Sequence, residues 1–114
     1  MMIFVMIQKK KNCNIGNIQL IGELYNNNLV NNETILNILD LISNSLDNYL
    51  DDKDLFINYV ECFSKLIFIT YIKNNDFIIN YYDIIKKNSI NKNYPPKSRF
   101  CFMDLIDIYQ KIKL

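Results

Sequence analysis

The fold of this chain is decided by the stretch Gly16-Asn17-Ile18-Gln19-Leu20-Ile21-Gly22-Glu23-Leu24-Tyr25. Its apolar residues recur at helical spacing and cover one broad face, which predicts a buried helix. Gly22 lies inside that face, although a glycine within a helix costs about 1 kcal/mol relative to alanine. We therefore expect a neighbouring helix to approach closely at Gly22, where no side chain stands in the way. Asn17 and Glu23 interrupt the stretch with polar side chains, and we expect both to tie adjacent turns or loops.

The composition indicates a single domain without a histidine-based active site. The 114 residues are 50% hydrophobic, which suits one domain, residues 1–114, with one core. The formal net charge of +1 provides no overall field for nucleic acid, so any basic surface has to be local. The chain contains no histidine, and it therefore lacks the usual general base, zinc ligand and near-neutral pH switch. Its lysine, asparagine and isoleucine content suits an A/T-rich genome, such as that of a large DNA virus or a parasite.

The cysteines and the apolar start both favour a reduced, cytoplasmic location. Cys13, Cys62 and Cys101 are odd in number and form no CxxC pair, so they indicate neither a disulfide framework nor a zinc site. The apolar residues 1–8 are too few to span a membrane, and their lysines follow rather than precede them, unlike a secretory signal. We expect no membrane contact, and we expect residues 1–12 to form a helix or an extended lead-in.

Turn residues and apolar periodicity divide the rest of the chain into helices. The residues at 77–79 could also be read as the start of a strand, but no second strand accompanies them. A polar loop is expected at 47–54 and a basic, asparagine-rich loop at 86–94. The predicted helices cover residues 15–25, Asn31 or Asn32 to 46, 55–73, 77–85, and a last helix that begins at Pro95-Pro96. The sequence thus predicts an all-α fold of about five helices, with antiparallel helix pairs stacked side by side.

Motifs for catalysis or metal binding are missing. Gly16 and Gly22 are the only glycines, and they do not form a phosphate-binding loop. Asp104 and Asp107 have a spacing that metal ligands can use, but no second carboxylate pair accompanies them, which favours a solvated helix face. The acidic run at 51–54 lacks the glycine and glutamate of a calcium loop. We therefore expect no enzyme activity, no metal and no cofactor.

Two basic clusters are the remaining candidates for binding. The first is Lys9, Lys10 and Lys11, and the second comprises Lys86, Lys87, Lys92, Lys97 and Arg99. The simpler interpretation of either cluster is a solvated surface. The more specific interpretation is a docking surface for RNA phosphates or for an acidic partner. On the last predicted helix, Phe100 lies off the inward stripe, so we expect an aromatic side chain near the surface beside Lys97 and Arg99. The alternative is that Phe100 packs under the preceding loop.

Three segments of the chain, taken in order, carry a family signature. They are residues 16–25 (GNIQLIGELY), 59–67 (YVECFSKLI) and 99–108 (RFCFMDLIDI). These segments resemble the GNIxFIGELF signature, the SLECLCRLL segment and the closing RFMLQDVLDLR helix of the middle domain of eukaryotic translation initiation factor 4 gamma. The resemblance covers nearly the whole chain but only about the C-terminal half of the family domain. It implies a stack of HEAT-type helical repeats that acts as a scaffold and not as an enzyme.

The resemblance also implies partners and site residues. The family domain binds a DEAD-box RNA helicase of the initiation factor 4A type and contacts RNA. The positions that match its C-terminal helicase contact are Lys97, Arg99, Phe100, Asp104 and Asp107. The family's other helicase contact would lie in the half that is not covered here. The family's basic triplet falls on Lys11, Asn12 and Cys13, and its final arginine falls on Tyr109, so the match is incomplete at both places.

Two alternatives stay open at this stage. The first is a module that binds RNA directly, with Lys9, Lys10, Lys11, Lys86, Lys87 and Lys92 on the phosphates. The second is a related HEAT adaptor from mRNA decay or splicing, since those proteins share the fold. The GNIxxIGEL pattern in residues 16–24 favours the initiation factor over that second alternative.

Overall fold

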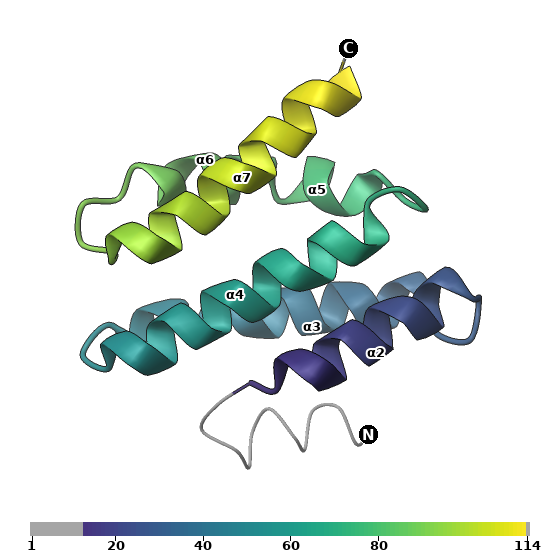
Figure 1. Ribbon diagram of the computed structural model, residues 1–114, viewed down its shortest axis with the longest axis horizontal. Helices are drawn as coiled ribbons and strands as arrows, with labels where there is room; N and C mark the ends of the chain where they lie inside the picture. The colour runs from purple at the N-terminus through teal and green to yellow at the C-terminus, as the bar shows by residue number, and fades with distance from the viewer. Residues whose placement is uncertain (1–12, 114) are drawn as a thin grey trace.

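Helices make up most of the described chain. The computed structural model describes residues 13–113, and no strand is present within them (Figure 1). The prediction of an all-α fold is therefore confirmed, while the predicted lead-in over residues 1–12 lies outside the described residues. The elements are α2 (Ile15–Asn26), α3 (Asn32–Ser45), the 3-10 helix η1 (Leu46–Tyr49), α4 (Lys53–Thr70), α5 (Asp76–Asn80), α6 (Tyr82–Ser89) and α7 (Pro96–Lys113).

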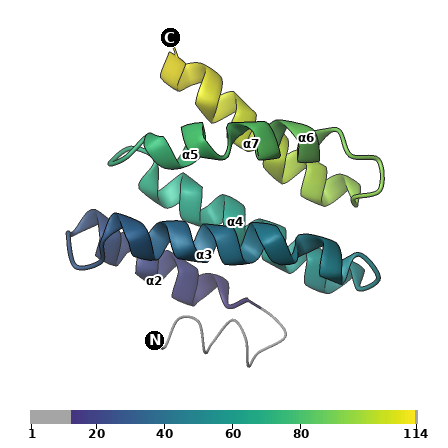
Figure 2. The same ribbon diagram turned by 180° about the vertical axis from the view of Figure 1, so that it is seen from behind.

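The helices form a slab of two layers. Helices α2, α4 and α7 lie side by side in one layer, and α3, α5 and α6 lie behind them (Figures 1 and 2). The chain runs in one direction along the first layer and returns along the second. The Cα extents of 40 × 37 × 18 Å agree with a thickness of two helices, whose axes pack about 8–10 Å apart.

Helix α4 is the central element of the core. It contacts α2 and α7 within its own layer and α3 behind it, and so it is covered on several sides. A helix that is apolar on more than one face is typically covered in this way. Burial of one large apolar side chain contributes about 1.5–3 kcal/mol, so α4 is the largest single contributor to the core. Its buried residues are Leu55, Phe56, Tyr59, Val60, Cys62, Phe63, Leu66, Ile67 and Thr70.

Short polar side chains mark the starts of three helices. Asn14, Asn31 and Asp52 each accept a hydrogen bond from the backbone N–H three residues later, at the first turn of α2, α3 and α4. Each bond satisfies a donor that the helix itself leaves free. After α2, Asn28 adopts a φ of 65°, a left-handed conformation that asparagine tolerates. The predicted start of the second helix at Asn31 or Asn32 is confirmed, with Asn31 as the cap, and the first helix ends at Asn26, one residue beyond its predicted end.

Helix α4 approaches α2 closely at Gly22. A Cβ atom at this position would lie 2.8 Å from Cγ2 and 3.1 Å from Cβ of Ile69, which is closer than ordinary van der Waals contact. The amide of Asn26, one turn further along α2, donates to the carbonyl oxygen of Ile69 at 3.0 Å and joins the same two helices. The close helix approach expected at Gly22 is therefore present.

Asn17 and Glu23, which were expected to tie turns or loops, have different surroundings. The backbone N–H of Asn17 donates to the side chain of Asn14 at 3.2 Å and so belongs to the cap of α2. The side chain of Glu23 is exposed, while its carbonyl oxygen accepts from the backbone N–H (3.1 Å) and the side-chain amide (2.8 Å) of Asn27. Glu23 therefore ties the loop after α2 through its backbone carbonyl oxygen.

The prediction of one continuous helix over residues 77–85 is wrong. It breaks at Tyr81 into α5 and α6, so the described residues contain six α-helices and not five. Tyr81 is buried, and its hydroxyl donates to the side chain of Asp40 and contacts the carbonyl oxygen of Leu36 at 3.3 Å, both on α3. The break accompanies this contact with α3, the neighbouring helix of the rear layer, and no glycine or proline marks it in the sequence.

The predicted basic loop over residues 86–94 is also partly wrong. Its first residues belong to α6, which continues to Ser89 because Ile85 and Ser89 are buried against the core. The Ser89 hydroxyl donates to the carbonyl oxygen of Lys86 at 2.7 Å and closes the last turn. Lys86 and Lys87 are therefore helical, and only the residues after Ser89 form the loop before α7.

The polar loop predicted over residues 47–54 contains helical structure as well. The 3-10 helix η1 covers its beginning, and the first turn of α4 covers its end. The ring of Tyr49 in η1 stacks on Tyr59 of α4 with centroids 4.8 Å apart, which fixes the connection on the core. Only a short turn is left between the two helices.

Candidate docking surface

One face of α7 is open to solvent. Proline at the first position of this helix has the backbone angle that a first turn needs, which confirms the predicted start. The buried face carries Phe102, Leu105 and Ile108. The open face carries residues three or four positions apart along the helix, and these are Lys97, Phe100, Asp104 and Asp107.

Phe100 is the outstanding side chain of this face. It is 60% exposed, and exposed aromatic side chains are enriched where proteins bind one another. The alternative that Phe100 packs under the preceding loop is therefore wrong. The loop uses its own Tyr94 instead, whose ring packs on Phe56 with centroids 4.6 Å apart.

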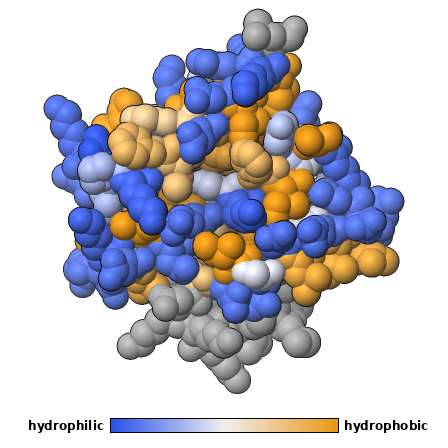
Figure 3. All heavy atoms as spheres, viewed as in Figure 1, coloured by the Kyte–Doolittle hydropathy of each residue, from blue (hydrophilic) through white to orange (hydrophobic). Residues whose placement is uncertain are grey.

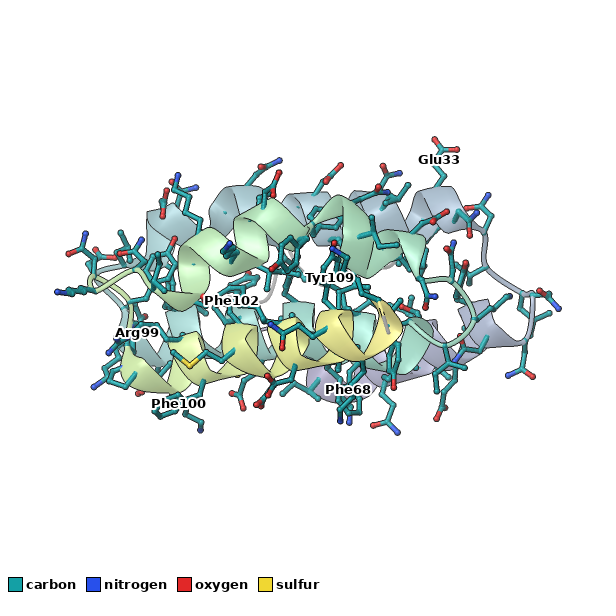
Figure 4. All side chains as sticks on the ribbon, turned by 90° about the horizontal axis from the view of Figure 1, so that it is seen from above. Glu33, Phe68, Arg99, Phe100, Phe102 and Tyr109 are labelled. Carbon is teal, nitrogen blue, oxygen red and sulfur yellow. The ribbon has the colours of Figure 1, made fainter. Side chains whose placement is uncertain are left out.

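Arg99 does not share the open face. Its side chain is half-buried, and its Nε is buried without a hydrogen-bond partner. Figure 4 shows Arg99 and Phe100 pointing to different sides of α7. The expectation that Arg99 points outward beside Phe100 is therefore wrong, because consecutive residues of a helix diverge by about 100°.

A groove runs between α4 and α7 beside the open face, and we refer to it as the α4–α7 groove. Its volume is about 380 Å³. Asp104 belongs both to the groove and to the open face of α7. Figure 3 shows this side of the molecule, where hydrophobic and hydrophilic residues alternate over α4 and α7. The lining residues are Ile15 on α2, Glu61, Ser64, Lys65 and Phe68 on α4, and Cys101, Asp104 and Leu105 on α7.

Phe68 is a surface residue that the sequence patterns do not single out. It is 56% exposed, and Figure 4 shows it on the same side of the molecule as Phe100. Its ring contacts Tyr71 edge-on, with centroids 6.1 Å apart. A helical wheel places Phe68 about 160° from the buried Leu66, and this angle is the signal that could have identified it.

Two carboxylates converge on the Cys101 thiol in the groove. Burial raises the pKa of Cys101, and the charges of Glu61 and Asp104 raise it further. The Ser64 hydroxyl and the Lys97 ammonium, which favour the thiolate, offset part of this rise. Because Glu61 is on α4 and Asp104 is on α7, the packing of these helices creates a negative field that neither helix has alone.

The second predicted basic cluster is divided between different parts of the surface. Lys86, Lys87 and Lys92 are exposed. Lys87 lines a separate hollow of about 210 Å³ together with Tyr94 and residues at the end of α3, whereas Lys97 acts on the groove beside α4. The first cluster, Lys9, Lys10 and Lys11, lies outside the described residues.

No other kind of site is apparent in the described part of the chain. Within residues 13–113, no three cysteine, aspartate or glutamate side chains are grouped so that they could hold a metal ion. None of the helices in this part is both long and apolar enough to cross a bilayer. Comparisons with protein-family models, curated proteins and solved structures find no match for this chain.

Proposed function

We propose that this protein is a non-catalytic scaffold of translation initiation that binds a DEAD-box RNA helicase of the initiation factor 4A type. The observation that carries the proposal is Phe100, which is 60% exposed on α7. It lies within residues 99–108, the segment that resembles the closing helix of the factor 4 gamma middle domain. A large aromatic side chain left in water is typical of an interface anchor, whose truncation often costs about 2 kcal/mol or more.

The arrangement of the helices supports a HEAT-type scaffold. Successive helices run antiparallel between the two layers, α2 packs beside α4, and α6 packs on α7 (Figures 1 and 2). Stacked pairs of this kind bury their core between neighbours and leave an extended face for a partner. A cytoplasmic helicase would then dock on α7, with Lys97, Asp104 and Asp107 as the polar rim around Phe100.

The test is the affinity of a recombinant factor 4A-type helicase for the parent protein and for Phe100→Ala, measured by isothermal titration calorimetry. We expect the variant to bind about 30-fold more weakly, which corresponds to 2 kcal/mol. Arg99 is kept unchanged, since replacing a half-buried side chain would also disturb packing.

The matched control is Ile90→Ala, which truncates an apolar side chain that is 72% exposed before α7. Both variants should melt as the parent does, and the control should keep its affinity. Equal binding by the parent and Phe100→Ala, or no binding by the parent at micromolar concentration, would contradict the proposal.

Direct RNA binding is the second candidate, and the exposure of Lys86, Lys87 and Lys92 favours it. Binding through phosphates should weaken steeply with salt and depend little on sequence. The double variant Lys86→Glu and Lys87→Glu should bind RNA more weakly than a variant with Lys53→Glu and Lys111→Glu, which changes the net charge equally. Binding that is insensitive to salt would leave these lysines as solvated surface.

A further inference from the structure

The α4–α7 groove has a lining that fits one long side chain. Its apolar walls come from three helices and include Ile15, Phe68 and Leu105. Its volume of about 380 Å³ is at the lower end of ligand pockets, which hold about 300–1,000 Å³, so it suits a side chain more than a whole helix. Phe68 is 56% exposed at the groove and offers an aromatic face to a partner.

The polar part of the groove favours a positive charge. Glu61 and Asp104 both act on the Cys101 thiol, so their charges reach the same part of the groove from opposite helices. Lys65 is the one cation among the lining residues, and Lys97, outside the lining, offsets the effect of the two carboxylates on the thiol only in part. The Ser64 hydroxyl lines the groove beside the Cys101 thiol, and its oxygen can accept a bond from a donor placed there.

We infer that the α4–α7 groove receives an arginine side chain from the protein that docks on α7. This inference rests on the proposed function and adds the chemistry of the contact. The aliphatic stem of the arginine packs between Ile15 and Leu105, and its guanidinium lies on the ring of Phe68. The guanidinium then donates to the carboxylates of Glu61 and Asp104.

Arginine fits this groove better than lysine does. A guanidinium presents five donors in a plane, so that it can bridge two carboxylates and still stack on an aromatic ring. An ammonium is a compact, strongly hydrated charge and gains less from the apolar walls. Because Figure 4 shows Phe68 and Phe100 on the same side of the molecule, one partner can cover the open face and the groove together.

The negative field of the groove can be tested without any partner. Cys13 and Cys62 are buried, so alkylation of the native protein by iodoacetamide, mapped by mass spectrometry, reports on Cys101. Neutralising the carboxylates with Glu61→Gln and Asp104→Asn should lower the pKa of Cys101 and speed its alkylation at pH 8 about twofold or more. The control Asp107→Asn, on the open face outside the groove, should leave the rate unchanged. Equal alkylation rates of Cys101 in the parent, the carboxylate variant and the control would overturn the inference, whether or not a partner binds at Phe100.

The arginine contact is tested with the same helicase that tests Phe100. The variants are placed on α4, away from the proposed contact on α7. Glu61→Arg should weaken binding about tenfold or more through like-charge repulsion, whereas Glu33→Arg on the far side of the slab should not (Figure 4). Phe68→Ala should also weaken binding, whereas Ile72→Ala, at a position 81% exposed and outside the groove, should not. A partner arginine changed to glutamate should restore binding to Glu61→Arg.

The outcomes separate this inference from the proposed function. If Phe100→Ala weakens binding while Glu61→Arg and Phe68→Ala bind as the parent does, the helicase docks on α7 but the groove is not part of the contact. If the parent protein does not bind the helicase, the proposed function and the inference are both wrong. A loss of binding in the α4 variants, with unchanged melting curves and unaffected controls, supports the inference.

Discussion

Replacing Gly22 by leucine tests the contact between the first helix and the central helix. A Cβ at this position would lie 2.8 Å from Cγ2 of Ile69, so that atom would have to move by about 0.6 Å to reach the 3.4 Å at which ordinary contact begins. The Cβ of Ile69 would be only 3.1 Å away, and this atom moves only with the backbone of α4. A rotamer change alone therefore cannot relieve the contact, and α2 and α4 have to separate.

The magnitude follows from two opposing terms. Overpacking in a core costs about 1–3 kcal/mol, whereas replacing a helical glycine gains about 1 kcal/mol. For Gly22→Ala the two terms together lower the free energy of unfolding by about 1 kcal/mol. For Gly22→Leu, three further carbon atoms enter the same space. We therefore expect the free energy of unfolding to fall by about 3 kcal/mol, which corresponds to a fall in Tm of about 12 °C.

Thermal and urea unfolding followed by far-UV circular dichroism measure these changes. Gly16→Ala is the matched control, because the exposed Gly16 has only the side-chain oxygen of Asn14 near its missing Cβ, at 3.2 Å. The control should be as stable as the parent or slightly more so. The double variant Gly22→Ala with Ile69→Ala should be about 1 kcal/mol more stable than the sum of the two single losses predicts. A Gly22→Leu variant that melts with the parent would refute this account of the glycine.

Two further predictions concern the polar contacts that hold the slab together. Lys73→Met should lower the free energy of unfolding, measured in urea, by about 1–2 kcal/mol. The ammonium donates to the carbonyl oxygen of Tyr25 (2.5 Å) and to the side chain of Asn28 (2.6 Å), and the variant loses both bonds. An unchanged urea midpoint would contradict this. Burial and the hydrogen bond to Asp47 raise the pKa of Tyr94 to about 12, so the folded protein keeps a proton that the unfolded chain loses near pH 10. Stability should therefore fall as the pH rises from about 10 to 12, and it should fall less in Tyr94→Phe; parallel losses in the two proteins would exclude this source.

The starts and ends of helices were predictable where a local residue determines them. Asn28, Asn31 and Pro96 act through their own backbone angles or through hydrogen bonds to residues three positions away, so the sequence contains the whole cause. The break at Tyr81 has a different cause. It accompanies a contact with Asp40, 41 residues away in the sequence, and a local pattern holds no information about that contact.

The same distinction applies to the candidate docking surface. The exposure of Phe100 follows from the apolar stripe of its own helix, and the sequence identifies it correctly. The convergence of Glu61 and Asp104 does not follow from either helix, because it depends on how α4 packs against α7. Arg99 shows the opposite error, since charges that are neighbours in the sequence diverge on a helix and do not form one surface.

The position of α7 in the slab explains why the candidate surface lies there. Among the helices of residues 13–113, α4 has a neighbour on each side within its layer, whereas α7 has α4 on one side only (Figure 1). An edge helix therefore keeps an open face, while its junction with the next helix forms a groove. At that junction Phe68 is left in water in the same groove as Glu61 and Asp104, while Phe100 is exposed on the open face of α7. A partner that covers both helices would bury the aromatic rings and meet the carboxylates in one step, so its affinity should depend on α4 as well as on α7.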